Sequence, residues 1–515
     1  MDQKYSRREI LKMMTLMGLA QTRPVFFDQL RLASRDPNAQ NVLVILFDAL
    51  SAKNISLYGY PRETMPKLAK LAERAIVYHN HYAGGGFTTP ATASLLTGTL
   101  PWTHRAFNPH ATVAPEFEQR NLFSEFGRHG YYRVGYTHNI LADVFIKQFS
   151  GNMEKPLSRQ DLFLNDYWVS DLFENDYDTA SLAVLRSIED NKDGVTSGFF
   201  LPQLWDRFLS RQRAENAEAF KKLFPLGLPN VKANDFLLET AVDWLNEQVP
   251  AWPQPFLGYF HFLPPHDPYK TRRDFFHTFA NDGWEPVEKP EHPFTMGEKR
   301  NKNLRERINY DEFILYVDSE FRRLYRLLKK AGILENTWLV FTSDHGEMFE
   351  RGIWGHTHVT LLEPRAHIPL LIFPPGGTER VDVYDTTSAV DVLPTLMRVT
   401  GHPLPDWGEG LVLPPFNASG EHADRAVFSM ESDENEKYGE FTVGTFMIIR
   451  DGVKLIYYFG YPSQPDNKPY YEMYDLKDDP EELNNLYAEE SSLARRLREE
   501  LHAKLREVDQ PYLSS

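Results

Sequence analysis

The sequence predicts an α/β protein with a mixed, mostly parallel sheet sandwiched by helices and a smaller C-terminal subdomain of antiparallel strands and a helix. Two apolar runs, 41–47 and 337–341, lack polar alternation, which is typical of strands buried on both faces. Asp48 follows the first run directly, and Asp344 and His345 come shortly after the second. Ligand sites of doubly wound sheets lie at such strand ends. The runs around 446–458 indicate antiparallel strands.

The length of 515 residues exceeds what one hydrophobic core usually supports, so we expect more than one folded part. Residues 1–40 are interpreted as an N-terminal segment and linker, 41–419 as the main domain, and 420–515 as the C-terminal subdomain. Within the main domain, 150–231 and 270–304 lack the α/β alternation and are predicted to be insertions, the first largely helical.

Elsewhere the main domain is expected to alternate between strands and helices. The predicted strands after the first are 75–78, 132–136, 256–262, 337–341 and 368–373. The predicted helices are 66–75, one beginning near Pro90, 121–130, 234–248, 308–331 and one opening at Asp391. A last amphipathic helix carries leucines at four-residue spacing, which favours packing onto the subdomain rather than partner binding. These leucines are Leu493, Leu497, Leu501 and Leu505.

Composition excludes several classes of function. Lys plus Arg minus Asp plus Glu is 56 − 72 = −16, which argues against non-specific binding to nucleic acid or to an anionic membrane surface. Cysteine is absent, so disulfides, thiolate zinc sites and cysteine nucleophiles are excluded. No apolar stretch is long enough for a transmembrane span.

The N-terminal segment resembles a bacterial twin-arginine export signal. Arg7 and Arg8 precede Lys12 and the weakly apolar run 13–20. The alternative is an amphipathic helix with two solvated arginines. Export to the periplasm and a cytoplasmic location therefore both remain open.

Four polar groups fall at strand ends or at a helix start and could bind one divalent metal ion. Asp48, Thr88, Asp344 and His345 would supply three oxygens and one nitrogen, a set for which Zn or Mn is favoured and Ca or Mg is an alternative. The competing interpretation of the Asp-His pair is a helix cap and a turn. A dication, together with a helix N-terminus, would activate the otherwise poorly nucleophilic Thr88 hydroxyl.

Four histidines follow core strands or lie beside the metal motif. His138, His266, His356 and His358 are candidates for contacting the oxygens of a tetrahedral anion and for protonating a leaving alkoxide. Taken singly, each is better explained as a surface histidine. As a set, they favour an anion site.

From Asn41 to about Leu486 the chain resembles the sulfatase branch of the alkaline phosphatase superfamily. This resemblance implies an alkaline-phosphatase-like fold and a metal-dependent ester-cleaving site. The matching segments are 41–48, Tyr58-Gly-Tyr60, 88–98, Pro265-His-Asp-Pro268, 336–347, His367-Ile-Pro369, 391–395, 474–481 and Asn485-Leu486.

Several positions depart from that family's pattern. Thr88 and Thr92 stand where a true sulfatase has the Cys or Ser that becomes formylglycine and the arginine of the same motif. Threonine cannot give formylglycine, because its oxidation would yield a ketone. Ala49 replaces the second of two usual aspartates, and Tyr136 replaces the lysine of a Lys-x-His element that keeps His138. Ser51 and Asn54 replace two further charged residues.

A threonine nucleophile resembles that of the superfamily's phosphoethanolamine and phosphoglycerol transferases and phosphodiesterases. We therefore expect a metal-dependent hydrolase or transferase that acts on small-molecule, glycan-linked or lipid-linked phosphoesters through a phospho-threonine intermediate. One metal is expected, since no Asp-x-x-x-His element for a second is evident. The alternatives are a sulfuric ester hydrolase without formylglycine and a degenerate member that binds a glycan or anion without turnover.

Overall fold

The computed structural model describes residues 39–164, 216, 218–229, 236–418, 420–422, 424–462, 468–487 and 491–513. At its centre is an eight-stranded sheet in the order β10-β2-β9-β6-β1-β5-β3-β4, in which β9 alone runs antiparallel to its neighbours. Its strands are β1 (Asn41–Phe47), β2 (Ile76–Tyr82), β3 (Tyr132–Thr137), β4 (Lys155–Pro156), β5 (Phe256–Phe262), β6 (Thr337–Thr342), β9 (Leu370–Phe373) and β10 (Val381–Ser388).

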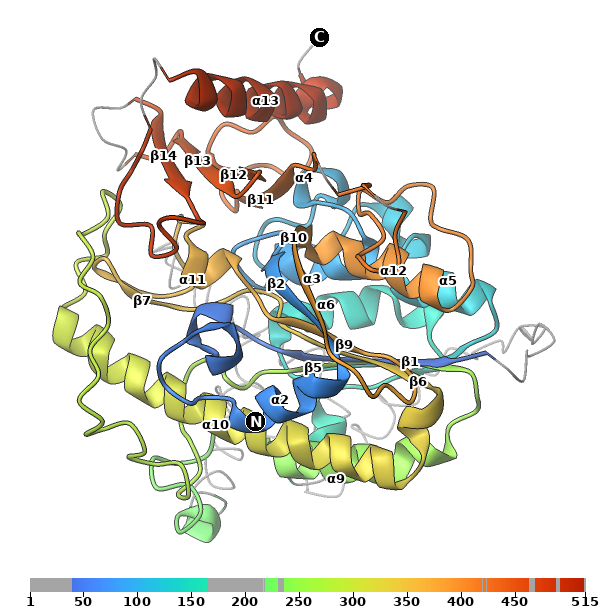
Figure 1. Cartoon of the computed structure of the whole chain (residues 1–515). Helices are drawn as coiled ribbons and strands as arrows, with labels where there is room; N and C mark the ends of the chain where they lie inside the picture. The colour runs from blue at the N-terminus through green and yellow to red at the C-terminus, as the bar shows by residue number, and fades with distance from the viewer. Residues whose placement is uncertain are drawn as a thin grey trace, which may run out of the picture. The chain divides into compact units, whose positions relative to one another are not determined.

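Helices cover both faces of this sheet (Figure 1). Strand β1 shows the reason, because alternate side chains of a strand point to opposite faces. Leu43 and Ile45 pack with α2, α9 and α10, whereas Val42 and Val44 pack with α3, α5, α6 and α12. Within the described residues, the labelled α-helices of the main domain are α2 (Pro66–Leu71), α3 (Thr88–Thr97), α4 (Pro101–His104), α5 (Leu122–Arg128), α6 (Ile140–Gln148), α9 (Leu238–Gln248), α10 (Arg300–Lys330), α11 (Glu363–Ala366) and α12 (Val392–Val399).

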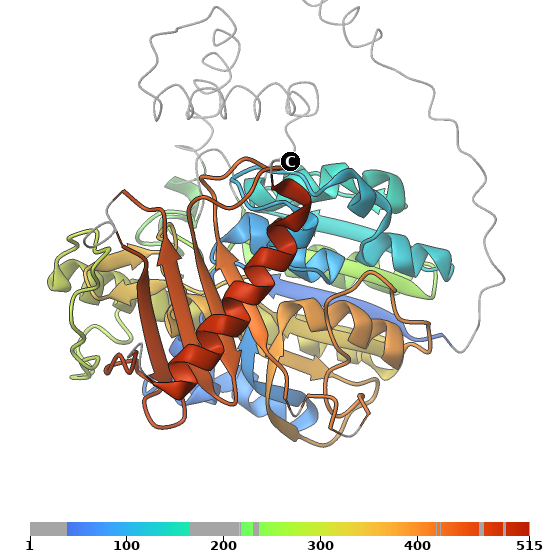
Figure 2. The same cartoon turned by 90° about the horizontal axis from the view of Figure 1, so that it is seen from above.

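A second, four-stranded antiparallel sheet is formed near the C-terminus. Its strands, in spatial order, are β11 (Val427–Glu431), β12 (Gly444–Arg450), β13 (Val453–Phe459) and β14 (Tyr470–Asp475). Helix α13 (Ser492–Asp509) lies across one face of this sheet (Figure 2). Leu497, Leu501 and Leu505 are buried there, whereas Leu493 is only partly buried. The other face packs against the segment that includes α11 and the hairpin of β7 (Met348–Glu350) and β8 (Ile353–Gly355).

The predicted fold class is therefore confirmed, with several local differences. Helix α10 begins at Arg300 rather than 308, because buried Asn303 and Arg307 bond to Ile353 and Glu350 instead of forming an apolar stripe. Strand β10 is unpredicted because its sequence is polar, as expected for a sheet edge.

Smaller corrections concern the ends of elements and the first insertion. The two-residue strand β4 lies inside the predicted insertion 150–231 and is too short to show a pattern. Helix α9 and strand β9 begin four and two residues later than predicted (238 − 234 and 370 − 368). Most of that insertion (165–215) and the twin-arginine segment lie outside the described residues. Within the described ranges, every helix is too short or too polar to cross a membrane.

Candidate active site

The carboxyl-terminal edge of the central sheet gathers the predicted site residues. Asp48 follows β1, Asp344 and His345 follow β6, and Thr88 is the first residue of α3. Strands β1 and β6 are parallel neighbours, so their carboxyl ends lie side by side. All four side chains are buried.

Asp48, Asp344 and His345 form a donor set that fits a divalent cation. Within the described residues they are the only group of three His, Asp or Glu side chains whose ligand atoms all lie within 4.8 Å of one another. Asp48 Oδ1 and Asp344 Oδ2 each lie 3.5 Å from His345 Nε2. Neither oxygen has a hydrogen-bond partner among the described residues, although both are buried. Buried carboxylate oxygens left in this way need a cation or a proton.

The electrostatics of the two aspartates agree with this interpretation. Burial and the neighbouring Asp48 carboxylate raise the pKa of Asp344 to about 7. Burial also disfavours the charge of Asp48, but the hydrogen bond from His261 and the nearby His266 and His345 hold its pKa below the ordinary value. A shared cation would remove the repulsion between the two carboxylates.

His345 is held in the tautomer that a metal ligand requires. Its Nδ1 donates to the carbonyl of Gly346 at 2.9 Å, so Nε2 is left with a lone pair that faces the two aspartates. Burial and the nearby His356 lower the pKa of His345 well below its usual range, which keeps the ring neutral. A neutral imidazole oriented through its other nitrogen is a typical metal ligand.

Thr88 places its hydroxyl beside the same donors. Thr88 Oγ1 lies 3.3 Å from His345 Nε2 and accepts a hydrogen bond from Asn139 Nδ2 at 3.1 Å. Because Thr88 opens α3, the unpaired N–H groups of that helix provide a positive potential for an anion bound to its oxygen. Thr92, at the family's arginine position, is buried, and its hydroxyl has no partner among the described residues.

The C-terminal sheet supports the glycine loop that leads to Thr88. Arg365 is fully buried and donates to the Gly86 carbonyl at 2.6 Å and to Glu431 of β11 at 2.8 Å. The amide of Met430 also donates to the Gly84 carbonyl at 3.3 Å. The position of the candidate nucleophile therefore depends on contacts from a strand more than 300 residues away (430 − 88 = 342).

His266 and His356 lie together at the outer side of the site. Their ring centroids are 4.6 Å apart, and the His356 and His345 centroids are also 4.6 Å apart. Burial opposes a charge on His266, yet its hydrogen bond to Asp267 and the carboxylate of Asp48 raise its pKa to about 10. In the metal-free fold, His266 is therefore expected to carry a proton at neutral pH. The Asp267 side chain is 41% exposed, so the site reaches solvent here.

The other two predicted histidines have different surroundings. His138 is buried with its ring 4.1 Å from that of Phe236, and neither ring nitrogen has a partner among the described residues. His358 Nε2 donates a hydrogen bond to the backbone carbonyl of Phe294 at 2.5 Å, so that nitrogen already has a partner within the protein. Their proposed contacts with substrate remain predictions.

Three further residues belong to the site and were not among the predicted functional residues. His261 donates from Nε2 to Asp48 Oδ2 at 3.0 Å, and Asn139 donates to the same oxygen at 2.5 Å. Glu347 accepts from His356 Nδ1 at 2.9 Å and is fully buried. The signal in the sequence was their position near the carboxyl ends of strands, because His261 is the penultimate residue of β5 and Asn139 and Glu347 follow β3 and β6.

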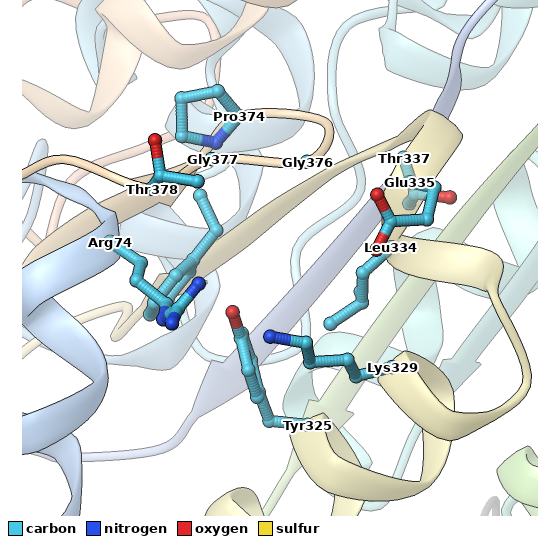
Figure 3. A pocket seen from close by; sticks show the side chains of 11 residues that line it. Arg74, Tyr325, Lys329, Leu334, Glu335, Thr337, Pro374, Gly376, Gly377 and Thr378 are labelled. Atoms are coloured by element: carbon cyan, nitrogen blue, oxygen red, sulfur yellow. The ribbon is translucent and has the colours of Figure 1, made fainter.

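A surface hollow of about 160 Å³ lies away from this chemistry. Arg74, Tyr325, Lys329 and Glu335 project toward it, and Thr337 at the start of β6 lines it (Figure 3). It therefore lies at the amino-terminal edge of the sheet, opposite to the edge that carries Asp344. Ligands of open α/β sheets bind at the carboxyl ends of the strands.

The chain belongs to the sulfatase family. The family described as Sulfatase matches residues 40–402, and the family described as N-sulphoglucosamine sulphohydrolase, C-terminal, matches residues 352–511. The family is metal-dependent, typically with ions of the calcium or magnesium type, and its members are hydrolases. The Asp-Asp-His group is the corresponding candidate metal site here.

Individual relatives are distant but cover most of the chain. A choline-sulfatase from Rhizobium meliloti (strain 1021) is 24% identical over 87% of this chain and 82% of its own length. A phosphonate monoester hydrolase from Silicibacter pomeroyi has a TM-score of 0.63 and 18% identity over 92% of this chain and 96% of its own. A structure solved with its substrate D-glucosamine-2-N,6-O-disulfate has a TM-score of 0.62 and 16% identity, over 92% of this chain and 98% of its own. These structures support the alkaline-phosphatase-like fold.

Proposed function

We propose that this chain is a metal-dependent hydrolase or transferase that cleaves phosphoesters through Thr88 as the nucleophile. The observation that carries the proposal is the position of Thr88 Oγ1, 3.3 Å from a candidate metal ligand and at the first residue of α3. The chain has no cysteine, so a cysteine-derived formylglycine is excluded. Of the candidate cations, Mn or Zn suits the imidazole ligand of His345 better than Ca or Mg does.

A bound dication would lower the pKa of the Thr88 hydroxyl and offset the negative charge of the phosphoryl group. Thr88 Oγ1, having released its proton to solvent, forms a bond to phosphorus while the bond from phosphorus to the leaving oxygen breaks. The departing alkoxide takes a proton from His266 or His356. Water, or an acceptor alcohol, then attacks phosphorus and gives its proton back to the histidine, and the bond to Thr88 Oγ1 breaks.

The substrate is proposed to be a small-molecule, glycan-linked or lipid-linked phosphoester that enters beside His266 and Asp267. Two neighbours in fold are named phosphonate monoester hydrolases, which supports attack at phosphorus. Hydrolysis of a sulfate ester is the second candidate, favoured by the sulfatase names of the relatives. A sulfated threonine, however, lacks the easy release that collapse of a formylglycine hemiacetal gives.

The test compares p-nitrophenyl phosphate, a phosphodiester analogue and p-nitrophenyl sulfate as substrates. Protein stripped of metal is re-supplied with Mn²⁺, Zn²⁺, Ca²⁺ or Mg²⁺, and Thr88→Ala and Thr88→Ser are assayed in parallel. We expect metal-dependent phosphoester turnover that Thr88→Ala abolishes and Thr88→Ser partly retains, because serine keeps the hydroxyl. Sulfate turnover that survives in Thr88→Ala would overturn the proposal.

A further inference from the structure

Asn139 is fixed in one orientation at the junction between β3 and α6. It is the N-cap of α6, and its Oδ1 accepts a hydrogen bond from the amide of Leu141 at 2.7 Å. The backbone N–H of Asn139 donates to Thr137 Oγ1 at 3.1 Å. Because Oδ1 is used in capping, Nδ2 must point the other way, which settles the orientation of the side-chain amide.

Both hydrogens of Nδ2 are directed at the site. Nδ2 donates to Asp48 Oδ2 at 2.5 Å and to Thr88 Oγ1 at 3.1 Å. The side chain is 5% exposed, so water does not compete strongly for these contacts. One amide group therefore bridges a candidate metal ligand and the candidate nucleophile, and its direction is set by a helix cap.

We propose that Asn139 is a catalytic residue whose amide holds Thr88 Oγ1 in line for attack and stabilises the negative charge on that oxygen when it leaves. This inference rests on the proposed function of Thr88. In the second half of the reaction the bond between phosphorus and Thr88 Oγ1 breaks and its electron pair goes to Oγ1. A preorganised N–H donor 3.1 Å away favours that step.

The effect should be unequal between the two half-reactions. With a p-nitrophenyl ester, the first leaving group is a stabilised phenolate that depends little on help from the protein. The second leaving group is an alkoxide, which depends on it strongly. Loss of the Asn139 donor should therefore slow release from Thr88 more than attack by Thr88, and the covalent intermediate should accumulate.

The test uses Asn139→Ser and Asn139→Ala in the full chain loaded with Mn²⁺. Both variants lose the amide donor, but serine still caps α6 and alanine does not. We expect kcat to fall about 10²-fold in both variants, the loss typical of one oxyanion donor. After acid quench of turnover, mass spectrometry of the peptide containing Thr88 should show a larger modified fraction than in the wild type.

Other outcomes would overturn the inference. An unchanged kcat in Asn139→Ser with impairment only in Asn139→Ala would mean that the residue serves as a cap alone. If the variants lost bound Mn²⁺ in the same proportion as they lost kcat, and no modified Thr88 accumulated, Asn139 would serve only to hold Asp48. Absence of modified Thr88 in every protein with p-nitrophenyl phosphate and p-nitrophenyl sulfate alike would also overturn it.

The proposed function fails in a distinguishable way. Accumulation of sulfo-Thr88 from p-nitrophenyl sulfate, with no phospho-Thr88 from the phosphate ester, would refute phosphoester chemistry and still support the role of Asn139. Conversely, Thr88-dependent phosphoester turnover that is equal in the wild type and in Asn139→Ser would uphold the function and refute the role of Asn139.

Discussion

Addition of Mn²⁺ to metal-free protein is expected to raise the free energy of unfolding, and to raise it more at pH 7.5 than at pH 5.5. The reason is the pair of buried carboxylate oxygens of Asp48 and Asp344, which have no hydrogen-bond partner among the described residues. A cation bound only by the folded chain stabilises it by mass action, about 4 kcal/mol when free metal is a thousand times the dissociation constant.

The pH dependence follows from Asp344. Its pKa of about 7 in the metal-free fold means that a proton must leave before the metal can bind. At pH 5.5 this competition weakens binding roughly 25-fold relative to pH 7.5, which is about 2 kcal/mol. His345 adds no dependence in this window, because its pKa is already well below the usual range.

The metal-free protein should show the opposite trend. The folded-state pKa of Asp344 lies above its ordinary value of 3.8, so the folded chain retains a proton that the unfolded chain releases. Its contribution to stability is therefore fully present below about pH 4 and is lost as the pH rises through about 7. Bound metal replaces that proton and removes the loss.

The assay is thermal unfolding over a titration with MnCl₂ at both pH values. Isothermal titration calorimetry in two buffers of different ionisation enthalpy would count the protons released. Asp344→Asn keeps an acceptor for the amides of Ala49 and His345 but loses the charge, so it should lose most of the stabilisation by Mn²⁺. The control is Asp318→Asn, which neutralises a buried carboxylate that accepts from the amides of α2.

Two results would refute this reasoning. The first is stabilisation by Mn²⁺ that is equal at pH 5.5 and pH 7.5. The second is equal stabilisation of the wild type and Asp344→Asn.

Two further perturbations test the supports of the site. Lys454→Met should lower the free energy of unfolding by about 3–5 kcal/mol, because it removes the buried ammonium that lies 3.0 Å from Glu363 and 2.9 Å from Glu482 and that these two buried carboxylates share. Denaturant unfolding measures this loss against that of Lys53→Met, whose ion pair is partly exposed, and equal losses would contradict the prediction. Gly86→Ala should lower the free energy of unfolding by about 1–3 kcal/mol and reduce activity, because its Cβ would lie 2.0 Å from Glu431 Oε2. The control, Gly151→Ala, should leave stability unchanged, because nothing lies within 4 Å of its Cβ. A stable and fully active Gly86→Ala protein would contradict the prediction.

The central strands could be predicted from the sequence because burial on both faces leaves a local record. Strands β1, β5 and β6 are continuous apolar runs, and their bounds match the predictions to within one residue. The sequences of strand β10 and of the start of α10 contain no comparable apolar run. Their stability comes from pairing with β2 and from side-chain bonds to residues 43 and 50 positions away, not from an apolar period.

The candidate site divides in the same way. The sequence by itself determined the residue types and their positions at strand ends, namely Asp48, Thr88 and the Asp344-His345 pair, because parallel strands bring their carboxyl ends to one edge. Only the tertiary structure decided that Asn139, 51 residues from Thr88 and 91 from Asp48, bridges those two side chains. It also decided that His358 bonds to Phe294. Side-chain direction depends on caps and on packing between distant segments, and no local pattern in the sequence encodes it.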